Sequence, residues 1–204
     1  ITGTMDGMGT LSLTYGTMAA GKSTLALQLC WQLRETRDDV AMWTFGDRSG
    51  EGRVTSRLGI SAEAISVTPG HPIAALKREL IRSGARVLVV DEVQFASIEQ
   101  VDDLAKLVDE HGMDVHCFGL GADFKLDVFP ATARLFAYAD SVSELPLAAY
   151  CWCGQRGRCN ARVINGVVQT DGAQHVLGDV TEAGNSSLRY QVLCRRHWRS
   201  GDLG

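Results

Sequence analysis

A glycine-rich segment near the N-terminus has the residue types and the spacing of a phosphate-binding loop. It reads Gly16-Thr17-Met18-Ala19-Ala20-Gly21-Lys22-Ser23, after a β-prone run and before a helical pattern. The glycines let backbone N–H groups converge on phosphate oxygens, and the helix N-terminus adds positive potential. Lys22 supplies a mobile positive charge, and the Ser23 hydroxyl is a type of ligand that Mg²⁺ accepts. We therefore expect an ATP and Mg²⁺ site from Gly16 to Thr24, the alternative being a turn with an incidental lysine.

Two carboxylates follow the most apolar run of the chain. Val87-Leu88-Val89-Val90 is apolar on both faces, as a central parallel strand must be when helices cover both sides of a sheet, and Asp91 and Glu92 come directly after it. A Mg²⁺-bound nucleotide needs a second acidic anchor at the end of a neighbouring strand, and Asp91 has that position. Glu92 can then accept a proton from a substrate hydroxyl or position a water molecule. The alternative for Glu92 is a helix-start carboxylate without chemistry.

Four of the six cysteines fall in the last quarter of the chain. With no recognisable secretion signal, clustered thiols indicate a metal rather than disulfides. Two close pairs bracket about forty residues, a spacing that suits a tetrahedral structural Zn²⁺ held by Cys151, Cys153, Cys194 and His197. The first pair is Cys-x-Cys where Cys-x-x-Cys is more usual, and Cys159 is a fifth candidate. A ligand set that uses Cys159 and a module without metal therefore remain alternatives.

The order of the predicted elements indicates how these residues are positioned. Between Thr10 and Leu145, short β-prone runs alternate with amphipathic helical windows, which is typical of a parallel α/β sheet with helices on both faces. The expected strands cover residues 11–15, 40–44, 86–90, 115–119 and 141–145, and the expected helices lie near residues 22–36, 72–83, 97–111 and 130–139.

Boundary signals sharpen three of these expectations. Ser97 with Gln100 three residues later is a capping-box pattern, and Gly112 stands just past the end of the apolar helical repeat. Asn165-Gly166 between β-branched pairs predicts a two-residue hairpin turn in the C-terminal region. Residues 179–187 are polar and aperiodic, and we expect them to form a mobile loop.

Length and charge bound the organisation of the chain. We expect a flexible leader or cloning remnant at residues 1–9, an ATP-binding α/β domain at residues 10–146 and a zinc-binding hairpin module at residues 147–204. The net charge of −4 is uneven, because residues 1–150 hold 13 Lys and Arg against 20 Asp and Glu, and residues 151–204 hold 7 against 4. Such a chain is a poor candidate for coating nucleic acid, and no apolar run approaches the ~18 residues of a membrane span. We expect no stable nucleic-acid partner and no membrane association.

These motifs occur in the order of one enzyme family. They are Gly16–Ser23, Asp47-Arg48, Ser56-Arg57-Leu58-Gly59, Asp91-Glu92-Val93-Gln94-Phe95 and Cys194-x-x-His197. On these residues the chain, from about Leu11 to Trp198, resembles the thymidine kinases of the P-loop, zinc-containing (type II) family. The resemblance implies a RecA-like ATP-binding domain followed by a zinc-stabilised lasso that closes over the nucleoside. It also implies MgATP and thymidine as substrates, thymidine triphosphate as a feedback inhibitor, and a cytoplasmic homotetramer.

The resemblance further implies roles for individual residues. Glu92 matches the base that deprotonates the 5′-hydroxyl, and Arg48 matches an arginine near the transferring phosphate, where it acts with Lys22. The nucleoside is expected to lie against Met18, Phe95 and Tyr190, with Asn160 where many members have a threonine near the pyrimidine. Phe124 completes an aromatic pocket suited to a neutral nucleoside, although Phe124 and Phe129 are alternatively plain packing residues. Backbone groups of the lasso are expected to grip the nucleoside at Val176, Leu177 and Gly178.

We therefore expect an ATP-dependent kinase that phosphorylates the 5′-hydroxyl of thymidine and of deoxyuridine, in deoxynucleotide salvage. One rival is a nucleic-acid-stimulated ATPase whose zinc hairpin binds DNA or RNA, which predicts a basic, aromatic-lined groove. Another is a regulatory nucleotide-binding switch, which would leave Glu92 without a role.

Overall fold

A six-stranded parallel sheet forms the centre of the computed structural model, which describes residues 9–46, 52–174 and 188–204. The strand order is β5-β2-β6-β7-β1-β8, and every neighbouring pair is parallel. The strands are β1 (Leu11–Tyr15), β2 (Val40–Phe45), β5 (Ile65–Val67), β6 (Val87–Asp91), β7 (Asp114–Gly119) and β8 (Ser141–Glu144). The predicted α/β class is confirmed.

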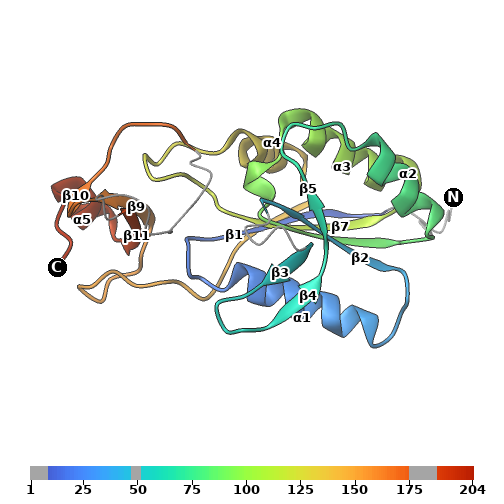
Figure 1. Ribbon diagram of the computed structural model, residues 1–204, viewed down its shortest axis with the longest axis horizontal. Helices are drawn as coiled ribbons and strands as arrows, with labels where there is room; N and C mark the ends of the chain where they lie inside the picture. The colour runs from blue at the N-terminus through green and yellow to red at the C-terminus, as the bar shows by residue number, and fades with distance from the viewer. Residues whose placement is uncertain (1–8, 47–51, 175–187) are drawn as a thin grey trace, which may run out of the picture.

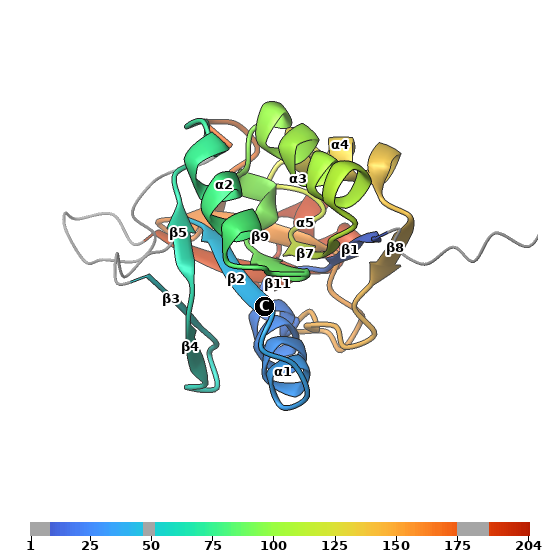
Figure 2. The ribbon, with the colours of Figure 1, turned by 90° about the vertical axis from the view of Figure 1, so that its right-hand side faces the viewer.

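Helices cover both faces of this sheet (Figure 1). One face carries α1 (Lys22–Arg34), and the opposite face carries α2 (Ala74–Arg82), α3 (Ile98–His111) and α4 (Pro130–Tyr138) (Figure 2). Because β6 lies between two covered faces, all five of its residues are buried, and its apolar run meets a core cluster on each side. A short 3₁₀ helix, η1 (Val93–Phe95), follows β6 directly.

The predicted capping box at the start of α3 is confirmed. The Ser97 hydroxyl accepts a hydrogen bond from the Gln100 N–H, and Gln100 Oε1 accepts one from the Ser97 N–H at 2.8 Å. The Gln100 side chain is almost fully buried, and its Nε2 also donates to the carbonyls of Thr68 and His71. Gln100 therefore fastens the loop before α2 to the first turn of α3.

Sequence patterns missed a hairpin and an edge strand in the first half of the chain. The hairpin pairs β3 (Arg53–Thr55) with β4 (Ser61–Glu63), and β5 follows at the edge of the central sheet. Each strand has three residues, too few for an alternating pattern to show. The hairpin packs against α1 (Figure 2), so its turn at residues 56–60 lies within reach of the phosphate-binding loop.

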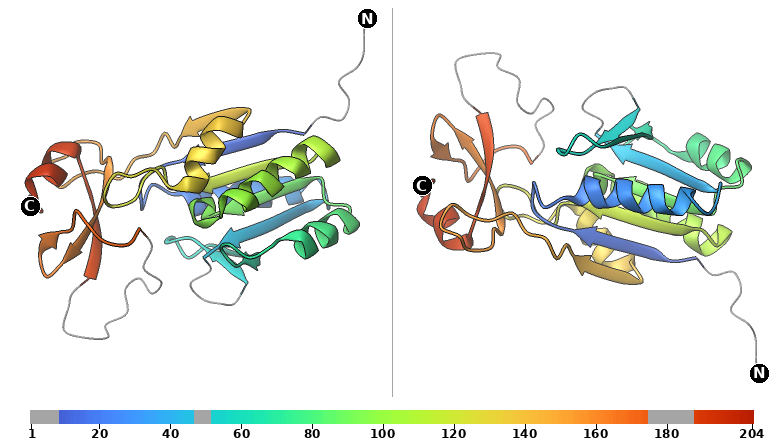
Figure 3. Two further views of the ribbon diagram at one scale, coloured as in Figure 1. Left: turned by 90° about the horizontal axis from the view of Figure 1, so that it is seen from above. Right: turned by 90° about the horizontal axis from the view of Figure 1, so that it is seen from below.

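The C-terminal region forms a separate antiparallel sheet in the order β10-β9-β11. Its elements are β9 (Cys159–Ile164), β10 (Val167–Val168), β11 (Leu188–Leu193) and α5 (Arg195–Ser200). The predicted Asn165-Gly166 turn is confirmed, since both residues have positive φ, 51° and 78°, as a type I′ turn requires. This sheet lies at the opposite end of the molecule from α2 (Figure 3). No helix in the described part of the chain has the length and apolar character needed to cross a membrane.

Candidate active site

The phosphate-binding loop connects β1 to α1 as the sequence predicts. Ala19 and Gly21 have positive φ, 59° and 91°, so the chain reverses tightly just before the helix begins. The Gly16 N–H donates to the Gly119 carbonyl at 3.2 Å, which joins the start of the loop to the end of β7. The Lys22 side chain is only 7% exposed, and its Nζ donates to the Thr17 carbonyl at 2.8 Å. The loop therefore folds around a buried ammonium group.

Opposite charges from a different strand balance this ammonium group. Burial lowers the pKa of Lys22, and Arg57 adds to that effect, whereas the carboxylates of Glu92 and Asp91 raise it. Asp91 is itself buried at the end of β6, where desolvation and the Glu92 charge raise its pKa and a hydrogen bond with Ser23 opposes the rise. A cationic and an anionic group thus face each other beneath the loop.

The oxygen atoms around Asp91 fit a magnesium ion. Asp91 Oδ1 is buried and finds no hydrogen-bond partner among the described residues. An orphaned carboxylate oxygen costs free energy unless a cation or a donor meets it, and the Ser23 hydroxyl beside it is a second hard oxygen ligand. The predicted Mg²⁺ ligands therefore lie together.

Glu92 lines the cavity from an unusual backbone conformation. Its φ and ψ are 55° and 33°, in the left-handed region that few residues with a Cβ adopt, and η1 begins directly after it. The side-chain amide of Gln94 donates a hydrogen bond to Glu92 Oε2. Glu92 therefore lines the same cavity as the phosphate-binding loop.

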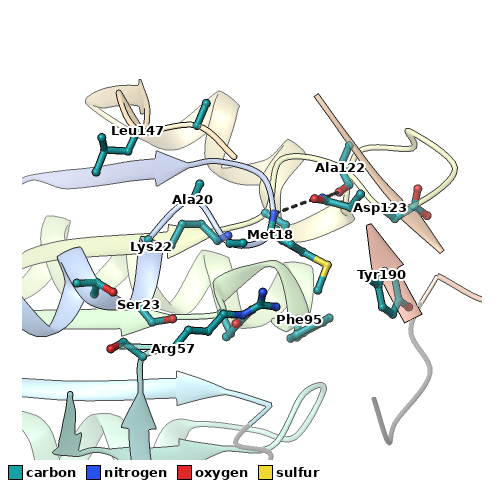
Figure 4. Close-up of a pocket in the computed structure, with 18 of the residues that line it drawn as sticks. Met18, Ala20, Lys22, Ser23, Arg57, Phe95, Ala122, Asp123, Leu147 and Tyr190 are labelled. Carbon is teal, nitrogen blue, oxygen red and sulfur yellow. Dashed lines mark hydrogen bonds between the residues drawn. The ribbon is translucent and has the colours of Figure 1, made fainter. Parts of the chain in front are cut away.

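One cavity of about 470 Å³ joins the phosphate-binding loop to the C-terminal sheet (Figure 4). Of the residues predicted to bind substrates, those that line it are Met18, Ala19, Ala20, Gly21, Lys22, Ser23, Thr24, Glu92, Phe95, Phe124, Asn160 and Tyr190. Gly16, Thr17 and Asp91 are not among the lining residues. The predicted Arg48, and the predicted Val176, Leu177 and Gly178 with the loop 179–187, lie outside the described residues.

Arg57 is a lining residue whose role sequence reasoning missed. It lies in the turn between β3 and β4, and Figure 4 shows its guanidinium between Lys22 and Phe95. The segment Ser56-Arg57-Leu58-Gly59 is visible as a motif in the sequence, but nothing local indicates that it forms the turn of a two-stranded hairpin beside the phosphate-binding loop. Arg57 and Lys22 together give this end of the cavity two cationic groups.

Aromatic rings line the opposite end of the cavity. Phe95 and Phe129 meet edge to face with ring centres 6.0 Å apart. The guanidinium carbon of Arg162 lies 3.7 Å from the centre of the Phe124 ring. Arg162 Nε also donates a hydrogen bond to the Tyr190 hydroxyl at 2.9 Å. Tyr190 belongs to β11, a strand that the sequence patterns did not predict. Phe124 and Phe129 are buried and line the cavity, so each is both a packing residue and part of the cavity wall.

Asn160 connects the two sheets at the cavity wall. Its Oδ1 accepts a hydrogen bond from the Met18 N–H at 2.8 Å, and its Nδ2 donates to the Ala122 carbonyl at 3.3 Å (Figure 4). Both ends of the amide therefore bind protein backbone. Asn160 lines the cavity as expected, but its amide tethers the phosphate-binding loop to β9.

The four predicted zinc ligands converge in space. The ligand atoms of Cys151, Cys153, Cys194 and His197 lie within 4.8 Å of one another, and this cluster could hold a metal ion. Cys159 is buried and is not one of the four. Burial raises the pKa of Cys151, but hydrogen bonds from the Cys153 and Cys194 backbone and from His197 outweigh it and lower that pKa to about 6. A thiol of this kind readily supplies the thiolate that a metal binds.

Sequence comparisons with known proteins agree on one family. A family model described as thymidine kinase covers residues 9–198. The chain belongs to the thymidine kinase family. A thymidine kinase of Streptomyces avermitilis is 42% identical over 90% of this chain and 86% of its own. Thymidine kinases of Cutibacterium acnes and Streptomyces coelicolor are 40% and 43% identical over 97% and 90% of this chain, and 91% and 86% of theirs. The matched residues include both sheets, so all residues that line the cavity lie within the match to the thymidine kinase family.

We expect Asn160→Leu to lower kcat/KM for thymidine by at least about tenfold. The change leaves the Met18 N–H and the Ala122 carbonyl without their partner, and an unsatisfied buried polar group costs about 1–3 kcal/mol. Steady-state kinetics with both substrates measures it. Asn160→Asp is the matched control, because it keeps the oxygen that accepts from Met18 and should lose less. Unchanged kcat/KM in Asn160→Leu would show that the tether is dispensable.

Proposed function

We propose that this chain transfers the γ-phosphoryl group of MgATP to the 5′-hydroxyl of thymidine, and also of deoxyuridine, in deoxynucleotide salvage. One observation carries the proposal: a single cavity has a phosphate-binding loop with a carboxylate at one end and an aromatic wall at the other. Membership of the thymidine kinase family supports thymidine as the acceptor. Such an aromatic wall suits a neutral aromatic nucleoside better than a basic groove would.

The phosphate end binds and polarises the donor. The backbone N–H groups of the loop and the α1 N-terminus attract the phosphates, and Lys22 moves from the Thr17 carbonyl to a phosphate oxygen. Asp91 and Ser23 would hold the Mg²⁺, which neutralises charge on the β- and γ-phosphates. Arg57 offsets charge that develops on the transferring group, with Arg48 proposed to act beside it.

Glu92 is the proposed general base. Its carboxylate lines the same cavity, and Gln94 hydrogen-bonds to only one of its oxygens, so the other can accept the proton of the 5′-hydroxyl. The hydroxyl oxygen then attacks the γ-phosphorus, the bond to the β-phosphate oxygen breaks, and ADP leaves. Exclusion of water by a nucleoside packed against Phe95 and Tyr190 would favour transfer over hydrolysis.

Zinc is the proposed metal of the four-residue cluster. Three thiolates and one imidazole form a ligand set typical of structural Zn²⁺, which leaves no open position for chemistry. The small sheet buries few apolar side chains of its own, namely Cys151, Ala161, Val163 and Leu193. A metal that joins the turn at residues 151–153 to the start of α5 would supply folding free energy that this small core lacks.

Other features of the family remain predictions for this chain. They are the domain boundary near residue 146, contacts of the nucleoside with Val176, Leu177 and Gly178, feedback inhibition by thymidine triphosphate, a homotetramer, a cytoplasmic location and the absence of a stable nucleic-acid partner.

Purified protein incubated with MgATP and thymidine should form thymidine monophosphate and ADP in equal amounts. Deoxyuridine should also be phosphorylated. Chromatography of the nucleotides after incubation with each deoxynucleoside separately measures both outcomes. ATP hydrolysis stimulated by single-stranded nucleic acid, without a nucleoside monophosphate, would support the rival ATPase instead.

Glu92→Gln should lower kcat by about 10²–10⁴-fold while nucleotide binding is kept, because a positioned general base contributes about that factor. Steady-state kinetics and ATP titration calorimetry measure the two effects. Lys22→Ala is the comparison variant, and it should weaken ATP binding and transfer together, since its charge acts on both the bound and the transferring phosphate. A near-normal kcat in Glu92→Gln would remove Glu92 from the mechanism.

We expect one tightly bound zinc per chain in protein purified without chelators, measured by plasma mass spectrometry. Cys153→Ser or Cys194→Ser should release the zinc and make the C-terminal sheet more sensitive to protease, while the central sheet stays folded. Cys159→Ser is the control, because Cys159 is not one of the converging residues. Zinc loss in Cys159→Ser but not in Cys151→Ser would show that the ligand set is wrong.

A further inference from the structure

We propose that Gln94 is a positioning residue that orients the Glu92 carboxylate for proton transfer. The inference rests on the proposed role of Glu92 as the base. It concerns a buried side chain that is not among the residues lining the cavity and so has no direct contact with substrates there.

Both ends of the Gln94 amide are engaged. The side chain is 2% exposed within η1; its Nε2 donates to Glu92 Oε2, and its Oε1 accepts from the Leu120 N–H at 2.9 Å. The Leu120 N–H fixes which end of the amide is the oxygen, so the NH₂ group must point to the carboxylate. The glutamine amide can accept a hydrogen bond from a backbone N–H and donate one to a carboxylate at the same time.

The end of β7 is shaped to hold this amide. A Cβ added to Gly119 would lie 2.8 Å from Gln94 Oε1 and 2.9 Å from Val93 Cγ1, closer than real contacts allow. A glycine therefore leaves the space that the amide fills. The Gly119 carbonyl also accepts from the Gly16 N–H, at the start of the phosphate-binding loop. Gln94 thus connects the carboxylate to the strand end against which the phosphate-binding loop is anchored.

The Glu92 carboxylate needs such an anchor because its side chain is flexible. It is a long side chain with three rotatable bonds, and among the described residues Gln94 is the side chain that hydrogen-bonds to its carboxylate. Lys22 from α1, Asp91 from β6 and Arg57 from the hairpin turn are the charged groups near this end of the cavity, and their charges act on it from several directions. Proton abstraction requires the base within hydrogen-bond reach of the hydroxyl, so a fixed rotamer raises the fraction of productive complexes.

Three variants test the proposal by steady-state kinetics with MgATP and thymidine. Gln94→Met keeps the length and removes both hydrogen bonds, and Gln94→Glu keeps the acceptor for the Leu120 N–H while it removes the donor to Glu92. Gly119→Ala keeps glutamine at position 94 but places a methyl group against its amide oxygen. Each should lower kcat by about 10–100-fold and leave the KM values for ATP and thymidine within about threefold.

Gln100→Met is the matched control. Gln100 is an equally buried glutamine whose amide is also hydrogen-bonded at both ends, but its partners are Ser97, Thr68, Gly70 and His71 and not the Glu92 carboxylate. This change should lower the thermal midpoint of unfolding as much as Gln94→Met does, with kcat within about twofold of the parent. If Gln100→Met lowered kcat as much as Gln94→Met, loss of a buried amide in general would explain the result and the proposal would be wrong.

A double-mutant cycle separates this inference from the proposed function. In a Glu92→Gln background, Gln94→Met should change the residual kcat by less than about twofold, because the group it positions is no longer a base. The same 10–100-fold loss in both backgrounds would overturn the positioning role. A slow Glu92→Gln enzyme with a normal Gln94→Met enzyme would also overturn it, and would leave the role of Glu92 intact. A normal Glu92→Gln enzyme would overturn both.

Discussion

The buried ammonium of Lys22 is the group on which the rest of the site depends. A buried charge strongly destabilises a fold unless hydrogen bonds and opposite charges surround it. The Thr17 carbonyl supplies the hydrogen bond from the same loop, but the compensating charges come from Asp91 at the end of β6 and from Glu92 directly after it. Because β7 lies between β1 and β6, these groups meet only if all three strands are parallel and end at one edge. The sheet topology is therefore a condition for the charge balance.

The second sheet depends on the first in a similar way. Its core is small, and it is joined to the α/β part by individual polar contacts. The Asn160 amide binds the Met18 N–H, the Trp198 indole donates to the Phe124 carbonyl at 3.0 Å, and Arg156 and Arg158 pair with Glu144. Exposed ion pairs contribute little, so the two part-buried hydrogen bonds, made by Asn160 and Trp198, matter most. Both are next to cavity-lining residues, so the contacts that join the sheets also form the site.

Patterns confined to a few consecutive residues could be predicted from the sequence. The phosphate-binding loop, the carboxylates after β6, the α3 capping box and the Asn165-Gly166 turn are local, and the four metal ligands follow a recognisable spacing. Arg57 could not be predicted as a cavity residue, because three-residue strands carry too little pattern to reveal the hairpin that places it there.

Long-range pairing decided the remaining differences. Tyr190 lies in β11 because that strand pairs with β9, and its hydroxyl meets Arg162 across the pair. The tether made by Asn160 depends on a backbone N–H 142 residues away. Only the geometry shows that both ends of its amide bind protein backbone.

The left-handed backbone at Glu92 sets the folding stability of this chain against its turnover. An L-residue pays roughly 1–2 kcal/mol for that conformation, which glycine adopts without a clash. Glycine would remove that backbone cost, but it would also remove a charge that compensates the buried Lys22 ammonium and the hydrogen-bond acceptor of Gln94. A redesign guided by backbone conformation alone would choose glycine here and remove the proposed base, so residue 92 must be held fixed in any such effort.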